Sequence, residues 1–221
     1  MFHFASTDQF GHGANLNVKT ASRYLWVGVI FIAAFISLGL AVRSGPTSFD
    51  LTVARFFAAH RTHSEVSVAR FVGAAAEPWV VGLVAIGIFG IRIYRKRLRS
   101  VGDFVPIAMI ASVAVCASLG KSFFGRARPD ATLAIFRIPE PSFPSSHTAF
   151  MAAAGCAFLF IVVRHRLLAV CAIWVATVFI GLDRLVLGVH WFTDLVGSVL
   201  LSWGLFFLFT SLSQSLKRGV S

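Results

Sequence analysis

Charged residues are scarce in this chain of 221 residues: only 13% are Asp, Glu, Lys or Arg, and the acidic residues number just 9. Soluble globular domains carry about 25% charged residues, so the composition excludes an ordinary soluble domain. Hydrophobic residues instead make up 57% of the chain, and Phe alone occurs 23 times. The composition therefore indicates an integral membrane protein.

Cysteine is also rare, and no internal repeat or low-complexity tract is visible in the sequence. Cys116, Cys156 and Cys171 lie within apolar runs, where we expect small buried hydrophobic side chains that indicate nothing about redox compartment. The polar segment 1–23 lacks a cleavable-signal pattern, so we expect the first apolar run to be retained as a helix. One helical bundle is the simplest domain organisation.

Apolar runs close to the ~20 residues that cross a bilayer recur along the chain. They predict an all-α polytopic bundle with six transmembrane helices: Tyr24–Val42, Trp79–Tyr94, Phe104–Gly120, Thr148–Val163, Leu167–Leu182 and Phe192–Leu212. The transmembrane domain would cover residues 24–212, between a cytoplasmic N-terminal segment, 1–23, and a cytoplasmic tail, 213–221.

A further amphipathic segment, Thr47–His60, follows the first run. It places four apolar side chains at helical spacing after a possible cap at Thr47 or Ser48, and these are Phe49, Val53, Phe56 and Phe57. The pattern fits an interfacial helix on the outer surface, and equally a helix packed on the bundle.

Six spans place the loops alternately on two sides of the membrane. The side with the N-terminus, residues 92–100, residues 164–166 and the C-terminal tail holds eleven Lys and Arg, and the other side holds nine. Cytoplasmic loops carry an excess of Lys and Arg, so we expect both termini in the cytoplasm. The membrane would be the plasma or inner membrane of the cell. Basic residues in short loops indicate contact with anionic membrane lipids and not with nucleic acid.

Three polar clusters lie at the ends of apolar runs in the second half of the chain. Their members are Lys121, Arg128 and Pro129; Pro144, Ser145, Ser146 and His147; and Arg184, His190 and Asp194. With alternating spans, all three emerge on the extracytoplasmic face. A charge at the bilayer centre costs at least ~2.5 kcal/mol, so we place the clusters near the interface, at the level of lipid headgroups.

The first two clusters carry groups that bind phosphate. Lys121 and Arg128 are two turns apart on one face if their helix continues, although Gly125 and Pro129 indicate that it loosens there. They would hold phosphate oxygens, or merely anchor the helix to headgroups. The segment before the fourth run would present backbone N–H groups to an anion, or be an ordinary Ser cap. His147 would then reach the same anion and could protonate a leaving oxygen.

The third cluster carries a possible nucleophile. His190 and Asp194 are four residues apart, so a helix would bring them to one face. The carboxylate would fix the imidazole tautomer and leave the other nitrogen free to attack phosphorus. Arg184 would hold the phosphoryl oxygens during that attack. A His and an Asp at this spacing often form a hydrogen-bonded pair that only stabilises the structure. The presence of three polar clusters on one face favours a phosphate-handling site.

These residues resemble the type 2 phosphatidic acid phosphatase superfamily of membrane lipid phosphatases. The family pattern is Lys, six residues, Arg-Pro; then Pro-Ser-Gly-His; then Ser-Arg, five residues, His, three residues, Asp. The chain matches it at Lys121, Arg128, Pro129, Pro144, Ser145, His147, Arg184, His190 and Asp194.

The resemblance implies a two-step reaction that needs neither metal nor cofactor. His190, assisted by Asp194, would attack phosphorus to form a phosphohistidine while His147 protonates the departing group, and water would then release phosphate. The phosphoryl group would be bound by Lys121, Arg128, Ser145, Arg184 and the backbone at Ser146.

Two positions depart from the family pattern. Ser146 replaces a glycine, so a side chain stands where the backbone would approach the anion. Asp183 replaces the serine before the arginine, which removes a hydroxyl donor and adds a negative charge. These departures bear on phosphate affinity and on the class of substrate.

The candidate substrates are undecaprenyl diphosphate, phosphatidylglycerol phosphate, phosphatidic acid and the phosphates of lipid A. We favour an isoprenoid diphosphate or a related lipid phosphate. A lipid phosphotransferase that uses the same site, and a non-catalytic phospholipid binder or transporter, are the alternatives. The sequence leaves the oligomeric state open.

Overall fold

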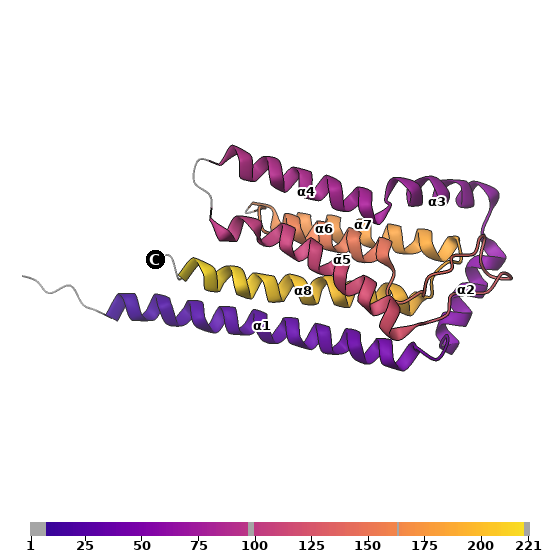
Figure 1. Cartoon of the computed structure of the whole chain (residues 1–221), viewed down its shortest axis with the longest axis horizontal. Coiled ribbons are helices and arrows are strands. Elements are labelled where there is room, and N and C mark those ends of the chain that lie inside the picture. Colours follow the sequence, from indigo (N-terminus) through magenta and orange to yellow (C-terminus); the bar gives the residue numbers. More distant parts are fainter. Residues whose placement is uncertain (1–7, 97–99, 163, 219–221) are drawn as a thin grey trace, which may run out of the picture.

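The computed structural model describes residues 8–96, 100–162 and 164–218, and within these ranges it contains helices and no strand (Figure 1). In chain order the elements are α1 (Asp8–Val42), α2 (Ser48–His60), α3 (His63–Ala75), α4 (Pro78–Arg95), the short 3₁₀ helix η1 (Val101–Phe104), α5 (Val105–Phe124), α6 (Ser146–Phe158), α7 (Arg166–Val186) and α8 (Phe192–Arg218). The all-α prediction is confirmed. Helix α1 begins within the segment that we expected to precede the first span.

The two short helices after α1 begin at capping boxes. The side chain of Thr47 accepts a hydrogen bond from the Asp50 N–H, and the Asp50 carboxylate accepts one from the Thr47 N–H, both at 3.0 Å. Thr62 and Glu65 repeat this arrangement at the start of α3. Each box satisfies backbone donors that a helix start otherwise leaves without acceptors. Of the two caps considered from the sequence, the structure therefore has Thr47.

Helices α1 and α4 to α8 run side by side, and α6 packs against α4, α5, α7 and α8 (Figure 1). Small residues make this close packing possible: the buried side of α6 includes Ala149, Ala152, Ala153 and Ala157, each 0% exposed. Small side chains let membrane helices approach closely and gain dispersion contacts. Helix α1 packs lengthwise along α8 at the edge of the bundle.

By length and composition, five helical stretches of the described chain could cross a membrane: Thr20–Val42, Pro78–Arg95, Val101–Phe124, Arg166–Val186 and Phe192–Leu216. They coincide with five of the expected spans. The expected span Thr148–Val163 is not among them, because α6 ends at Phe158 after 13 residues and continues as tight turns. At 1.5 Å per residue, α6 is about 20 Å long, short of a hydrocarbon core of about 30 Å. A sixth transmembrane helix is therefore not confirmed.

The outward surface of the bundle is apolar. Large exposed side chains include Trp26 at 63%, Ile30 at 62%, Leu119 at 63% and Leu167 at 78%. Contiguous exposure of this kind suits lipid and not water, which supports a multi-pass membrane protein. Cys171 is exposed on this surface as well and Cys116 is half-buried, so the expectation that all three cysteines are buried is confirmed only for Cys156.

Helix α2 lies across one end of the bundle and not along it (Figure 1). Its side toward the other helices carries the buried Asp50 and Ala54, whereas Phe49 and Phe56 are 55% and 56% exposed. The Phe49 ring meets the Phe192 ring edge-on, with centroids 5.1 Å apart. The helix thus packs on the bundle through a narrow strip and leaves much of its aromatic face uncovered.

Candidate active site

The three polar clusters meet at one end of the bundle. Helix α5 ends there, α6 begins there and the turn between α7 and α8 lies there, while the C-terminal end of α8 lies at the opposite end (Figure 1). Helices α2 and α3 cover the same end as the clusters. The structure therefore brings together the segments that the sequence predicted to share one face.

Lys121 and Arg128 reach this end from the last turn of α5 and the loop beyond it. The helix stops because Gly125 adopts a left-handed φ of 60°, which glycine tolerates at little cost. The predicted loosening is thus observed, and Arg128 does not continue the helical face of Lys121. Instead, Lys121 Nζ donates to the Pro141 carbonyl at 2.8 Å, and Arg128 Nε donates to the Glu140 carbonyl at 2.7 Å. The loop before α6 therefore positions both cations.

His190 lies in the turn before α8, and Asp194 lies in the first turn of that helix. The expected pair therefore forms across a helix start and not along one helical face. His190 Nδ1 donates to Asp194 Oδ2 at 3.1 Å, and Arg128 Nη1 lies 3.2 Å from His190 Nε2. Because a guanidinium can only donate, this network assigns the neutral tautomer with its proton on Nδ1. The lone pair is then on Nε2.

Burial keeps the His190 imidazole neutral. Its burial, together with the charges of Arg128 and Lys121, lowers the pKa of His190 to about 3, although the bond to Asp194 acts in the opposite direction. Only the neutral imidazole offers a lone pair for nucleophilic attack. At neutral pH, His190 Nε2 therefore has the electronic state that attack on phosphorus requires.

A buried arginine that the sequence analysis did not single out supports this pair from behind. Arg126 is 0% exposed, and its Nη1 donates to Asp194 Oδ1 at 2.6 Å while its Nη2 donates to Asp50 Oδ2 at 2.8 Å. The Thr193 N–H donates to Asp50 Oδ1 at 2.9 Å. This network links α2 to the start of α8, so the crosswise helix helps to hold the carboxylate that orients His190.

Little in the sequence connects Arg126 with Asp50. Arg126 is the additional cation between Lys121 and Arg128, and Asp50 is visible as the acidic residue of the Thr47 cap. The two residues are 76 positions apart, so no helical spacing relates them. The signal in the sequence was their charge alone, since one residue is a cation and the other a carboxylate.

The second cluster forms the start of α6, as predicted. Ser145 occupies the cap position, but its buried hydroxyl accepts a hydrogen bond from Thr148 Oγ1 at 3.2 Å and does not cap the backbone. Ser146 and His147 belong to the first helical turn, whose N–H groups have no acceptors within the helix. Such a helix start offers donors to a phosphate. The half-buried side chain of Ser146 stands beside these donors, and Pro144 precedes them.

Arg184, in the last turn of α7, faces His147 across the site. Arg184 Nη1 lies 3.2 Å from His147 Nε2, and Glu77 Oε1 lies 3.7 Å from the same nitrogen. The guanidinium packs against Gly73 of α3, where an added Cβ would lie 1.9 Å from Arg184 Nη2. Glycine at this position therefore allows Arg184 to reach His147. Neither Gly73 nor Glu77 was predicted as part of the site.

His147 is also neutral. Burial, followed by the charge of Arg184, lowers the pKa of His147 to about 3. The charge of Lys121 acts in the same direction, so residues of all three clusters share one electrostatic environment. A bound phosphate beside His147 would raise the pKa of the imidazole, because an opposite charge favours its protonated form.

Asp183, one of the two departures from the family pattern, contacts the neighbouring arginine directly. Asp183 Oδ2 accepts from Arg184 Nε at 2.6 Å and from Arg184 Nη2 as well. Both side chains are buried. The carboxylate fixes the plane of the guanidinium and offsets its charge, while Nη1 is left directed at His147.

Comparison with known proteins relates this arrangement to a family. A model of the PAP2 superfamily matches residues 104–218, a range that holds all three clusters. The chain is similar to a PAP2-type phosphatidylglycerolphosphate phosphatase from Bacillus subtilis, with a TM-score of 0.73 and 22% identity over 87% of this chain and 98% of that one. It is also similar to Aquifex aeolicus LpxE, with a TM-score of 0.59 and 22% identity over 75% of this chain and 96% of that one. No curated protein matches the chain significantly.

Proposed function

Because the chain belongs to the PAP2 superfamily, we propose that it is a membrane lipid phosphatase that hydrolyses a lipid phosphate or diphosphate through a phosphohistidine. The observation that supports this most is the geometry of His190. Its Nδ1–H is held by Asp194, and its Nε2 lone pair faces Arg128 Nη1 at 3.2 Å. A neutral imidazole oriented by a carboxylate beside a cation is suited to attack on phosphorus.

In the first step, His190 Nε2 forms a bond to phosphorus while the bond between phosphorus and the lipid oxygen breaks. His147 gives a proton to that oxygen, and Asp194 stabilises the positive charge that develops on the His190 ring. In the second step, water attacks phosphorus, passes a proton to His147 and displaces His190. One water is consumed, and the lipid product and inorganic phosphate leave.

His147 must receive its proton before the first step. Its pKa of about 3 leaves it neutral at pH 7. Phosphate monoesters lose their second proton near pH 6, so a bound substrate brings either negative charge or the proton itself to His147. Binding and protonation are therefore coupled in this mechanism.

The phosphoryl oxygens would be held by the cations around the two histidines. Arg128 and Arg184 each direct one Nη1 at a histidine nitrogen, and these donors would move to phosphoryl oxygens when substrate binds. Lys121 would add a point charge. The N–H groups at the start of α6 and the Ser145 hydroxyl would complete the set.

A substrate panel tests the function and its alternatives. The purified full chain is assayed with undecaprenyl diphosphate, phosphatidylglycerol phosphate, phosphatidic acid and lipid A, and we expect the highest kcat/KM with an isoprenoid diphosphate. Phosphate appearing on an added lipid acceptor would identify a phosphotransferase. Lipid binding without release of phosphate from any member of the panel would identify a non-catalytic binder and overturn the proposal.

We propose that the reaction needs no metal ion. The cations of the site supply the charge neutralisation for which other phosphoryl-transfer enzymes use Mg²⁺. Turnover should then survive EDTA, and vanadate, which resembles five-coordinate phosphorus, should inhibit. Loss of activity in EDTA that a divalent ion restores would contradict this part of the proposal.

We further propose that the chain crosses the membrane six times, with α6 as a short buried span, the termini in the cytoplasm and the site outside. The antiparallel course of α5, α6 and α7 supports this arrangement (Figure 1). Single cysteines at Ser100 and Ala131, in a background without native cysteines, lie at opposite ends of the bundle. Only the Ala131 cysteine should react with an impermeant reagent in intact cells, and the reverse pattern would invert the proposed topology.

A further inference from the structure

A polar cavity lies at the end of the bundle opposite to the candidate active site. It has a volume of about 330 Å³ and is lined by the C-terminal parts of α4 and α8, by η1 with the start of α5, by the turns after α6 and by the first residue of α7. Sites for small molecules have volumes of about 300–1,000 Å³. The cavity is therefore large enough for a phosphate group together with a small attached alcohol.

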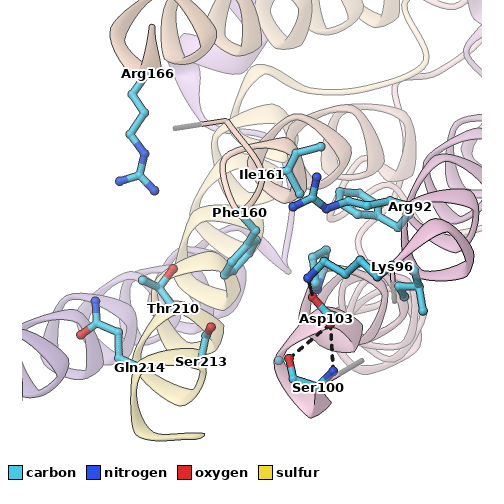
Figure 2. A pocket seen from close by; sticks show the side chains of 14 residues that line it. Arg92, Lys96, Ser100, Asp103, Phe160, Ile161, Arg166, Thr210, Ser213 and Gln214 are labelled. Carbon is cyan, nitrogen blue, oxygen red and sulfur yellow. Dashed lines mark hydrogen bonds and ion pairs between the residues drawn. The ribbon is translucent and has the colours of Figure 1, made fainter. Parts of the chain in front are cut away.

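Three basic side chains line this cavity, Arg92 and Lys96 from the C-terminal end of α4 and Arg166 from the start of α7 (Figure 2). Lys96 forms an ion pair with Asp103. Arg166 donates to the carbonyls of Val162 at 3.2 Å and Leu159 at 3.3 Å, which occupies Nε and Nη2 and leaves Nη1 available. The remaining basic residue, Arg92, is exposed. Four charged side chains thus line the cavity. Lys96 and Asp103 neutralise each other, so the net charge of the lining comes from the two arginines.

Arg92 is the most available of these cations. Within residues 8–96, 100–162 and 164–218, no hydrogen bond or ion pair to Arg92 is present. The Ser213 hydroxyl, on the α8 side of the cavity, likewise has no partner in the same ranges. A ligand with several acceptor oxygens would satisfy the guanidinium and the hydroxyl together.

The cavity is apolar toward the interior of the bundle. Phe89, Ile93, Pro106, Phe160 and Ile161 line it together with the polar groups. The candidate membrane spans Pro78–Arg95, Val101–Phe124 and Arg166–Val186 end or begin within a few residues of the charged side chains that line the cavity. Ends of spans lie near headgroup level. Positive charge at that level attracts anionic headgroups.

We propose that this cavity binds a phosphate anion, carried on an anionic lipid headgroup or free in solution, at a site separate from the candidate active site. Arg92 is the principal contact, Arg166 Nη1 the second, and the Ser213 hydroxyl donates a hydrogen bond. The apolar side accommodates the part of a lipid next to its headgroup. The proposal does not depend on phosphatase activity.

Binding to the purified full chain in detergent tests this site, with short-chain phosphatidylglycerol as the probe and phosphatidylcholine of equal chain length as the uncharged control. Native mass spectrometry counts the bound lipid, and a titration gives its Kd. Arg92→Gln should weaken the binding of phosphatidylglycerol by about fivefold, the effect of one charge near an anionic headgroup. Arg92→Lys, which retains the charge, should keep most of the affinity.

Arg95→Gln is the matched control, because Arg95 lies in the same last turn of α4 but does not line the cavity. It should leave the Kd unchanged, and Ser213→Leu, which fills the cavity without changing its charge, should weaken binding. If inorganic phosphate displaces phosphatidylglycerol from the wild type but not from Arg92→Gln, free phosphate is a ligand of the site. If inorganic phosphate does not compete, the ligand is the lipid headgroup. Equal effects of Arg92→Gln and Arg95→Gln, or equal binding of phosphatidylcholine, would overturn the proposal.

Phosphate release is measured on the same preparations, together with size-exclusion profiles. Neither Arg92 nor Ser213 touches the candidate active site, so both variants should keep wild-type turnover. A chain without phosphatase activity that still binds phosphatidylglycerol in an Arg92-dependent way would overturn the proposed function and support this site. A fully active chain that does not bind phosphatidylglycerol in an Arg92-dependent way would support the proposed function and overturn this site.

Discussion

The two ends of the helix bundle both carry basic side chains, but they hold the charges in different ways. At the candidate active site, Arg126 is fully buried and is bonded to the carboxylates of Asp50 and Asp194. At the opposite end, the ion pair between Lys96 and Asp103 joins side chains that are 36% and 13% exposed. At the first end, buried charges fix the positions of the side chains that they bond. At the second end, the charges stay in contact with solvent, where an anion can reach them.

This difference follows from the cost of burying ions. A buried ion loses several kcal/mol of hydration, which only close partners offset, so every buried charge at the first end constrains a neighbour. The orientation of His190 depends on Asp194, and Asp194 depends in turn on Arg126. At the second end, hydration makes pairing optional, which suits binding and release of an anion at the membrane surface.

The largest expected effect comes from removing the proposed nucleophile at the buried end. His190→Ala should reduce turnover by on the order of 10³-fold or more, because the covalent path is lost and not merely weakened. Release of inorganic phosphate from the preferred lipid measures this change. His63→Ala, at the exposed start of α3, is the control and should keep wild-type turnover. Near-wild-type activity of His190→Ala in the folded protein would exclude the proposed mechanism.

The next effect compares the two ends directly. Arg126→Gln leaves two buried carboxylates without their cation, so the free energy of unfolding should fall by about 3–5 kcal/mol. Lys96→Gln breaks a partly exposed pair and should cost at most about 1 kcal/mol. Unfolding in mixed micelles with increasing sodium dodecyl sulfate measures both. Equal losses would show that the network around Arg126 does not distinguish the two ends.

Acid should weaken the histidine end selectively. The pKa of His147 is about 3 in the folded chain and about 6.5 when the chain is unfolded. Between these values the unfolded chain binds a proton that the folded chain does not, so stability is lost as pH falls below 6.5. His147→Gln should therefore show a shallower loss of stability than wild type between pH 6.5 and about 5. Parallel curves for the two proteins would contradict the assigned pKa.

The sequence predicted the segments of this fold well where the signal was local. Apolar runs located five candidate spans, and residue type alone indicated the turn at Gly125 and narrowed the cap of α2 to Thr47 or Ser48. The length of α6 was not, because the apolar run through Val163 continues after the helix has ended at Phe158. Hydrophobicity reports burial or lipid contact, and it does not mark where helical hydrogen bonding stops.

The candidate site shows the same limit. Motif spacing predicted His147, Arg184, His190 and Asp194 as site residues, because each cluster is short and lies at the end of a helix. It did not reveal Asp50, which reaches the site through a buried partner 76 residues away. Nor did it indicate that Asp183 pairs with the residue next to it. Pairings of this kind depend on the tertiary structure and leave no periodic signal.

Asp183→Ser should have the smallest effect on activity, because its carboxylate bonds to Arg184 and acts on the site through that residue. Without the carboxylate, Arg184 keeps its full charge for phosphate, and KM should fall by about fivefold, which corresponds to about 1 kcal/mol. The melting temperature should also fall, because two hydrogen bonds from Arg184 to Asp183 Oδ2 are lost. Steady-state kinetics and thermal unfolding of this variant, with Asp130→Ser at an exposed loop position as control, measure both. A tenfold fall in kcat at unchanged KM would show instead that Asp183 positions Arg184 for the chemical step.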